Sequence, residues 1–337
     1  MNDLFEKLFS KQHLTRLEAQ QVADKMFEGK LTDSQIAAFL TAMKCKGETA
    51  EEMAGIAETI RRKAVVIKCQ KENVMDNCGT GGDQSGSFNI STTSAFVLAA
   101  GGVTVAKHGN RSISSKSGSA DIFECLGVDL ALSTEKLETL LNEIGLAFLF
   151  APHMHPKMKY VMNVRKELET PTILNLIGPL TNPVSLESQL MGTYRQDLLE
   201  ETAKTLGELG RKRAVVVHGF GGLDEASLAG TTNYALLEHG KITMHTIEPE
   251  ELGLKKMPLE AIRGGNAEQN TETLLSILKN QQSPYLDSVL LNAGLGFFSN
   301  GKTSSVEKGV LLAKDCIASG AAFDKLQQLI RIQKEVA

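Results

Sequence analysis

Two glycine-rich polar loops each follow a short apolar segment, and this repeated pattern restricts the fold more than any other feature of the chain. The first loop, 79–83, reads GTGGD and follows the strand-like segment 74–76. The second, 107–121, reads KHGNRSISSKSGSAD and follows the strand-like segment 103–106. Ligands of α/β sheets usually bind where a strand ends and a loop opens. Backbone amides freed by glycine, together with serine hydroxyls, can donate hydrogen bonds to phosphate oxygens there. The pattern therefore predicts an α/β domain with a site for a large polyanion.

Neither loop matches a common nucleotide-binding motif. The third glycine of G-x-G-x-x-G would fall on Gln84, and no G-K-[ST] follows the first loop. A flexible linker is disfavoured for the second loop, because apolar helical spacing follows it at 122–126. Asn89 precedes the apolar run 95–98 and is a capping residue, so we expect a helix N-terminus with unsatisfied amides at the same site.

A pair of acids, Asp224 and Glu225, follows the apolar run 215–217 and a glycine-rich turn. Magnesium takes oxygen ligands and commonly shares them with substrate phosphates, so few protein ligands are needed. Adjacent acids on a loop are common, but beside two phosphate loops they favour a divalent metal site. His153 and His155 form an H-x-H pair, which without a nearby third ligand is a weak zinc motif.

Local patterns divide the chain into two parts. Three capping boxes, at 15–18, 32–35 and 49–52, each precede helical apolar spacing, which predicts a small all-α domain over 1–69. Strands and helices then alternate, with a helix from about Glu135 and strands at 147–150 and 215–217. This alternation predicts a larger α/β domain over 70–337, with a central and mostly parallel sheet.

Composition narrows the class of protein. The formal net charge of the 337 residues is −4, and the sequence pI is about 6.0, which argues against a broad nucleic-acid-binding surface. The five cysteines show no C-x-x-C spacing, as expected of reduced thiols. No apolar run approaches the length of a membrane span, and the first residues do not form a signal peptide. We therefore expect a soluble, cytoplasmic protein that binds neither membrane nor nucleic acid.

Five motifs, in order and at matching spacing, resemble the anthranilate phosphoribosyltransferase family. They are GTGGD at 79–83, FNIST at 88–92, KHGNRSISSKSGSAD at 107–121, NLIGPLTNP at 175–183 and GLDEAS at 222–227. The resemblance runs nearly end to end. It implies transfer of the phosphoribosyl group of phosphoribosyl pyrophosphate (PRPP) to the amino group of anthranilate, with release of pyrophosphate, in tryptophan biosynthesis. Two alternatives are a pyrimidine nucleoside phosphorylase-like enzyme, whose loops differ from GTGGD and KHGNRS, and a non-catalytic nucleic-acid-binding paralogue, which would need a basic surface.

The same resemblance implies the site residues. The implied PRPP contacts are Gly79, Gly82, Asp83, Ser87, Asn89, Ile90, Ser91, Thr92, Lys107, His108, Gly109, Asn110, Arg111, Ser112, Ile113, Ser114, Ser115 and Ser119. The implied anthranilate contacts are Gly79, Asn110 and Arg165, with His108 and Pro179 bordering the ring. The implied magnesium ligands are Ser91, Asp224 and Glu225, with two Mg²⁺ ions accompanying PRPP. For His108, acceptance of the amine proton and a ring-packing role both remain open.

The resemblance also implies an arrangement. Helices around 159–188 would complete the helical domain, the active site would lie in the cleft between the domains, and the protein would be a homodimer. This chain departs from the family pattern at Asn163, where a proline is usual, and at 169–172, which reads ETPT in place of G-x-R-T. Both departures fall on the anthranilate side, so the affinity for the acceptor is the property that they affect.

Overall fold

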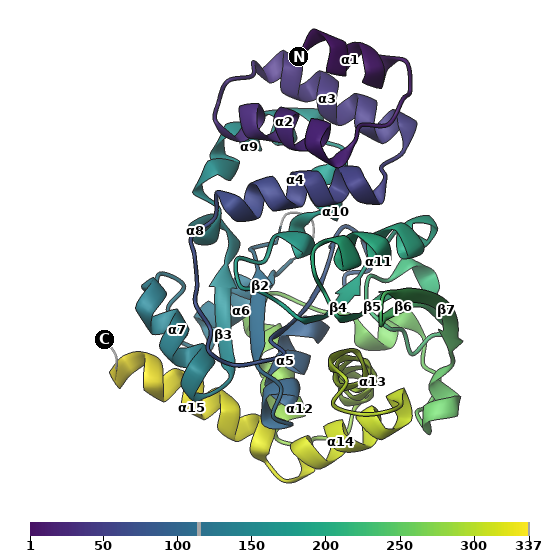
Figure 1. Cartoon of the computed structure of the whole chain (residues 1–337). Helices are drawn as coiled ribbons and strands as arrows, with labels where there is room; N and C mark the ends of the chain where they lie inside the picture. Colours follow the sequence, from purple (N-terminus) through teal and green to yellow (C-terminus); the bar gives the residue numbers. More distant parts are fainter. Residues whose placement is uncertain (113–115, 336–337) are drawn as a thin grey trace.

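The computed structural model describes residues 1–112 and 116–335. Helices from two separate parts of the chain form a small lobe at the top of Figure 1. These helices are α1 (Asn2–Phe9), α2 (Arg16–Phe27), α3 (Asp33–Lys46), α4 (Ala50–Arg62) and α9 (Lys159–Leu168). α9 contacts α2 and α3, so the segment that returns to the lobe packs on its first helices.

The larger part of the molecule is built on one sheet. Its strands are β1 (Met75–Gly79), β2 (Val105–Gly109), β3 (Leu146–Phe150), β4 (Ser188–Gly192), β5 (Arg213–His218), β6 (Thr232–Glu238) and β7 (Lys241–Ile247). In the described residues the strand order is β3-β2-β1-β4-β5-β6-β7. The pairings from β3 to β5 are parallel, and those of β5 with β6 and β6 with β7 are antiparallel. This confirms the predicted fold class of a mostly parallel α/β sheet with a small all-α domain.

Helices lie around this sheet, some between its strands in the chain and others after the last strand. The longer ones are α5 (Ile90–Ala100), α6 (Ser119–Cys125), α7 (Thr134–Glu143), α11 (Leu199–Glu208), α12 (Ala267–Leu278), α13 (Pro284–Asn300), α14 (Val306–Ala318) and α15 (Ala321–Glu335). The short ones are α8 (Ala151–Met154), α10 (Ile173–Leu176) and the 3₁₀ turns η1 (Pro156–Met158), η2 (Gly178–Thr181), η3 (Gln196–Leu198), η4 (Phe220–Gly222), η5 (Pro249–Leu252) and η6 (Leu259–Ile262). None of the described helices is both long and apolar enough to cross a bilayer.

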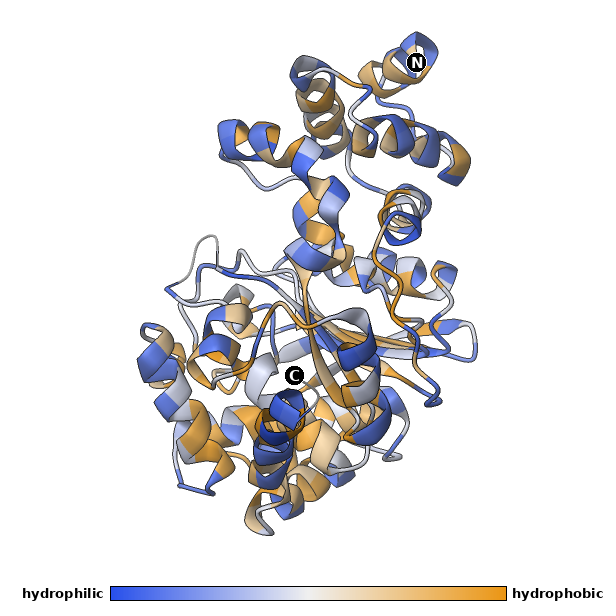
Figure 2. Ribbon diagram, turned by 90° about the vertical axis from the view of Figure 1, so that its left-hand side faces the viewer, coloured by the Kyte–Doolittle hydropathy of each residue, from blue (hydrophilic) through white to orange (hydrophobic). Residues whose placement is uncertain are grey.

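Two hydrophobic cores lie on opposite faces of the sheet. In β5, Val215 and Val217 belong to the core that contains α5 and α13, whereas Val216 belongs to the core that contains α11 and the helical lobe. This alternation follows from the two-residue period of a strand. Figure 2 shows the hydrophobic strands in the middle of the sheet domain, with hydrophilic residues on the outer sides of the surrounding helices. Because the second core runs from α2 to α4 through α11 to the sheet, the lobe and the sheet share buried apolar surface.

The three predicted capping boxes are confirmed. In each, the threonine hydroxyl accepts a hydrogen bond from the backbone amide three residues later, and that residue's side chain accepts one in return, at 15–18, 32–35 and 49–52. The third box also contains a buried ion pair, since Lys46 Nζ lies 2.6 Å from Glu52 Oε2 and both side chains are at most 1% exposed.

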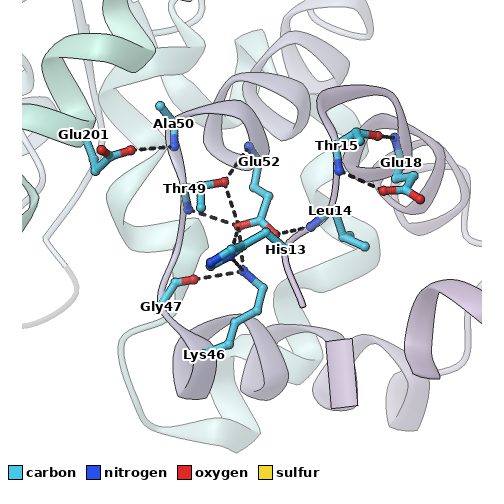
Figure 3. A network of polar contacts seen from close by, with 10 residues as sticks. All are labelled: His13, Leu14, Thr15, Glu18, Lys46, Gly47, Thr49, Ala50, Glu52 and Glu201. Atoms are coloured by element: carbon cyan, nitrogen blue, oxygen red, sulfur yellow. Dashed lines mark hydrogen bonds and ion pairs between the residues drawn. The ribbon is translucent and has the colours of Figure 1, made fainter. Parts of the chain in front are cut away.

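Figure 3 shows how Glu52 joins separate segments of the lobe. Its other oxygen, Oε1, accepts a hydrogen bond from the Leu14 amide at 2.7 Å, and His13 lies beside the ion pair. On the neighbouring turn, the Ala50 amide donates to Glu201 Oε2 of α11 at 3.1 Å. The start of α4 is therefore tied both to the α1–α2 connection and to the sheet domain.

Two strands differ from the sequence prediction. β2 ends at Gly109 rather than at Ala106, so Lys107 and His108 are strand residues with exposures of only 1% and 6%. The expectation that these two side chains emerge into an open loop is therefore wrong. Their polarity is tolerated inside the fold because partners are available, as where Lys107 Nζ donates to the Asn77 carbonyl at 2.8 Å. β1 likewise continues to Gly79, beyond the expected segment 74–76.

Candidate active site

Parallel strands end at one edge of the sheet, and the candidate site is built from the loops that follow them. β1 and β4 are in register so that Gly79 pairs with Gly192, and Gly192 pairs with Val217 of β5. The loop after β1 and the turn after β5 meet there. The Gly81 amide donates to Asp224 Oδ2 at 2.6 Å, and the Asp224 amide donates to Asp83 Oδ2 at 3.4 Å. The first phosphate loop and the acid pair, far apart in sequence, thus contact each other.

Two glycines make room for Asp224. A Cβ on Gly79 would lie 2.2 Å from Asp224 Oδ2, and a Cβ on Gly192 would lie 1.5 Å from the Asp224 carbonyl oxygen. Sequence reasoning misses Gly192, because it belongs to none of the recognised motifs. Only the register of β1 with β4 reveals its place, so a single sequence carries no local signal for it.

Asp83, Asp224 and Glu225 lie close together in partly buried positions. Burial, and next the charges of Asp83 and Glu225, raise the pKa of Asp224 well above its usual range. Burial also raises the pKa of Glu225, against the opposing effects of Lys107 and of hydrogen bonds from Ser91. A divalent cation would relieve this repulsion, and the oxygens of Ser91, Asp224 and Glu225 are the donor type that magnesium prefers.

Protein ligands alone do not enclose a metal here. Among residues 1–112 and 116–335, no group of three or more His, Cys, Asp and Glu side chains is arranged to hold an ion. The donor set nevertheless fits a magnesium ion that shares its coordination with substrate phosphates, since such ions commonly take only one or two carboxylates from the protein.

The start of α5 differs in one respect from the sequence prediction. Asn89 occupies the N-cap position, but its side chain makes no capping hydrogen bond. Instead Asn89 Nδ2 donates to the Ser117 carbonyl at 3.3 Å, and Asn89 Oδ1 accepts from Asn270 Nδ2 at 3.0 Å. Interaction with Ser91 in the first turn of α5 lowers the pKa of Glu225, so this carboxylate lies close to the start of the helix. The helix N-terminus expected at Asn89 is therefore confirmed, although the Asn89 side chain makes no capping hydrogen bond.

Asp76 of β1 is the centre of a network of hydrogen bonds among buried polar groups. Asp76 is fully buried, and it accepts hydrogen bonds from the His108 amide at 3.2 Å through Oδ1 and from Asn182 Nδ2 at 2.8 Å through Oδ2. The Cys78 thiol also donates to Oδ2, at 3.3 Å. Burial raises the pKa of Asp76, while the nearby Lys107 charge lowers it. The network fixes the ends of β1 and β2 relative to each other.

The expected PRPP contacts fall on four adjoining segments. They are Gly79, Gly82, Asp83 and Ser87 at the end of β1 and in the loop after it; Asn89, Ile90, Ser91 and Thr92 at the start of α5; Lys107, His108 and Gly109 in β2; and Asn110, Arg111, Ser112 and Ser119 between β2 and the start of α6. Ile113, Ser114 and Ser115 lie outside the described residues. Arg111 is exposed and paired with Asp121 at 2.7 Å and Glu124 at 2.5 Å. Contact between Arg111 and a substrate would therefore require these ion pairs to open.

Arg165 lies on α9, in the segment that returns to the helical lobe. Its side chain is half-buried, and burial lowers the pKa of its guanidinium. No carboxylate of the described residues lies within ion-pair distance of it, although a desolvated guanidinium favours an anionic partner. This is the environment expected of a residue that binds a substrate carboxylate.

The two departures from the family pattern have physical consequences beside Arg165. Asn163 Nδ2 donates to Asp33 Oδ2 of α3 at 2.8 Å, so it ties α9 to the lobe. Glu169 ends α9 in the left-handed region, with φ 45° and ψ 25°. Glycine adopts that backbone conformation without steric cost, whereas glutamate does not.

A hollow in the described structure lies away from these residues. It has a volume of about 800 Å³ and is lined by residues that include Arg213, Glu238, Lys302 and Lys308. Arg213 is the first residue of β5, so this hollow lies at the opposite edge of the sheet from Gly79 and Gly192. The candidate site is therefore identified by its converging polar groups and not by this hollow.

Comparisons with known proteins agree in covering the whole chain. Residues 71–323 match a family model described as the a/b domain of a glycosyl transferase family, and residues 2–64 match the helical bundle domain of such a family. The anthranilate phosphoribosyltransferase of Listeria innocua is 60% identical over 336 residues, which cover 100% of this chain and 99% of the relative. That of Streptococcus gordonii is 55% identical, covering 99% of this chain and 100% of the relative.

Solved structures of anthranilate phosphoribosyltransferases also match this chain over nearly its whole length. An anthranilate phosphoribosyltransferase from Thermus thermophilus superposes with a TM-score of 0.93 at 40% identity, covering 98% of this chain and 99% of that chain. The enzyme from Saccharomyces cerevisiae, in complex with PRPP and Mg, superposes with a TM-score of 0.90 at 26% identity, covering 99% and 97%.

Proposed function

The chain belongs to the anthranilate phosphoribosyltransferase family, and from this premise we propose that it transfers the phosphoribosyl group of PRPP to the amino group of anthranilate. The products are N-(5-phosphoribosyl)anthranilate and pyrophosphate, in tryptophan biosynthesis. The observation that carries the proposal is the contact of the GTGGD loop with the Asp224–Glu225 pair, in a chain that matches these enzymes over its full length. No feature of the described structure favours the phosphorylase or the nucleic-acid-binding alternative.

We propose that the loop after β1, the first turn of α5 and the segment from Lys107 to Ser119 bind PRPP. Glycine amides and serine hydroxyls at these positions would donate hydrogen bonds to the phosphates. Ser91, Asp224 and Glu225 would hold magnesium, with two ions for each PRPP. Bound magnesium would neutralise the negative charge that grows on pyrophosphate as its bond to the anomeric carbon breaks.

For the acceptor, we propose that the guanidinium of Arg165 binds the anthranilate carboxylate through two parallel hydrogen bonds. Asn110 and Gly79 would complete the contacts. The aniline nitrogen of anthranilate is a neutral nucleophile at pH 7, so the protein has to position it rather than activate it. Positioning and charge stabilisation are therefore the main catalytic contributions of this chain.

We also propose the larger arrangement that the family implies. Helices around 159–188 complete the helical domain of residues 1–69, the active site lies between it and the α/β domain of 70–337, and two chains form a homodimer through the helical domains. Large apolar side chains on this lobe support a contact, because Phe9, Leu17 and Met162 are 56%, 69% and 48% exposed. Light scattering coupled to gel filtration tests it, and a monomer at all concentrations would contradict it.

The activity is tested by following anthranilate fluorescence in purified protein mixed with PRPP and Mg²⁺. We expect a loss of fluorescence that requires protein, PRPP and Mg²⁺ together. Omission of each component, and chelation of the metal by EDTA, are the controls. Persistent anthranilate fluorescence, with PRPP bound in calorimetry, would overturn the acceptor but keep the phosphoribosyl site. Failure to bind PRPP would overturn the proposed function as a whole.

A further inference from the structure

Two buried histidines contact each other in the described structure. His108 lies in β2, and His155 follows α8 at the start of the segment that returns to the helical lobe. Their Nε2 atoms are 3.2 Å apart, and the rings meet edge to face at 80°. The two residues are 6% and 5% exposed. At this distance, one ring must donate a hydrogen bond and the other must accept it.

A second contact of His108 fixes the direction of this bond. The His108 ring also interacts with the backbone of Gly178, and this interaction raises the pKa of the ring, as a ring N–H directed at a carbonyl oxygen would. Because Nε2 faces His155, the donor to Gly178 is Nδ1. Burial is the main cause that lowers the pKa of His108 well below its usual range, so the ring is neutral and has a single N–H. Its Nε2 is therefore an acceptor, and His155 Nε2–H is the donor.

The same chain of bonds defines the state of His155. Burial also lowers the pKa of His155, to about 4, so this ring is neutral and carries a single proton. Because Nε2 donates to His108, that proton is on Nε2. Its Nδ1 is then a bare acceptor, and it is buried without a hydrogen-bond partner among the described residues. A void of about 10 Å³ borders His155, between Phe27 and Ile60 of the lobe and Met158. A void of this size is near the minimum that holds one water molecule.

We propose that His155 is a positioning residue, which holds His108 as the neutral Nδ1–H tautomer and thereby fixes the Gly178 carbonyl of the turn at 178–181. In this state both nitrogens of His108 are engaged inside the protein, one by Gly178 and the other by His155. His108 then cannot accept the proton of the attacking amine, and its role is to shape the wall of the anthranilate site. This assignment of a role in acceptor binding rests on the proposed function.

The tautomer itself is tested by ¹⁵N NMR of the imidazole rings, with the seven histidines labelled. In the wild-type protein we expect His108 with a protonated Nδ1 and an unprotonated, hydrogen-bonded Nε2. His155→Leu removes the donor and should let His108 populate the Nε2–H tautomer. His155→Gln keeps an amide N–H near the original donor position and should restore the wild-type tautomer. A wild-type His108 that carries its proton on Nε2, or on both nitrogens at pH 7, overturns the proposal even if a variant does not fold.

Kinetics separate positioning from a general loss of structure. Loss of one neutral hydrogen bond predicts that His155→Leu raises the KM for anthranilate by about 5- to 10-fold, with the KM for PRPP and kcat little changed. His155→Gln should recover most of the anthranilate affinity. An equal fall of kcat in both variants, or an unchanged anthranilate KM in His155→Leu, would contradict the role. If the wild-type protein consumes no anthranilate, the proposed function fails, whereas the NMR result still decides the tautomer.

Discussion

Replacing Gly192 by alanine should move Asp224 away from the phosphate loop. The added Cβ would lie 1.5 Å from the Asp224 carbonyl oxygen, whereas real Cβ atoms do not approach other heavy atoms within 3.0 Å. The clash involves backbone on both sides, so no side-chain rotation relieves it, and the Asp224 carbonyl must move by at least 1.5 Å. A misplacement of about 1 Å costs on the order of 10²-fold in rate where geometry controls catalysis. We therefore expect kcat/KM for PRPP to fall by about 10²-fold or more.

The chain supplies two matched variants for this experiment. Gly79→Ala places its Cβ 2.2 Å from Asp224 Oδ2, which can rotate away, and 2.8 Å from the Asp224 carbonyl oxygen. This backbone overlap is less severe than the one at Gly192, so the effect should be smaller and should appear as an increased requirement for Mg²⁺. Gly207→Ala makes the same chemical change in α11, where the nearest atom beyond the helix, Leu237 Cδ2, is 3.5 Å away, and it should leave the rate unchanged.

Initial rates of anthranilate consumption at varied PRPP and Mg²⁺ would measure these effects, with circular dichroism to confirm that each variant is folded. A folded Gly192→Ala protein with a wild-type kcat/KM for PRPP and a wild-type Mg²⁺ requirement would refute the reasoning. In that case the position of Asp224 could not matter to the reaction.

Four further predictions concern single residues or pairs. Arg165→Ala should raise the KM for anthranilate by about 10- to 100-fold and leave that for PRPP unchanged, because a hydrogen bond to a charged group contributes about 1.5–3 kcal/mol; an unaltered anthranilate dependence would sink the acceptor assignment. Asp224→Asn combined with Glu225→Gln should raise the Mg²⁺ concentration for half-maximal rate by at least about tenfold, and a magnesium titration identical to wild type would count against these ligands. Glu52→Ala should lower the free energy of unfolding in urea by about 3–5 kcal/mol, since it leaves a buried lysine unpaired; a loss below about 1 kcal/mol would show that the pair is dispensable. Glu169→Gly should raise that free energy by about 0.5–1 kcal/mol, because glycine tolerates the left-handed backbone, and a decrease would contradict this.

The features that could be predicted from the sequence are those set by nearby residues. The capping boxes of α2, α3 and α4 involve residues three apart, and the start of α7 and the strand at 146–150 follow from local apolar spacing. The parallel sheet follows from the alternation of strands and helices. Each of these depends on a short window, and a single sequence contains all the information that it needs.

What could not be predicted depends on contacts between distant segments. Lys107 and His108 are polar, so local patterning places the end of the strand before them, yet partners from β1 and from the segment after α8 make their burial possible. The role of Gly192 depends on the register of β4 with β1, and the interaction of Glu225 with Ser91 at the start of α5 joins segments that are distant in sequence. A local pattern holds no information about any of these pairings.

The distribution of charge explains why acids lie among phosphate loops. PRPP carries several negative charges, but two of the expected cations are already engaged within the described protein. Lys107 Nζ donates to a buried carbonyl, and Arg111 is paired with Asp121 and Glu124. Glycine amides can orient a phosphate, but they cannot cancel its net charge. Because these groups leave most of the substrate charge uncompensated, the role that we propose for the carboxylates of Asp224 and Glu225 is to hold magnesium that accompanies PRPP. Their mutual repulsion without a cation would favour that binding.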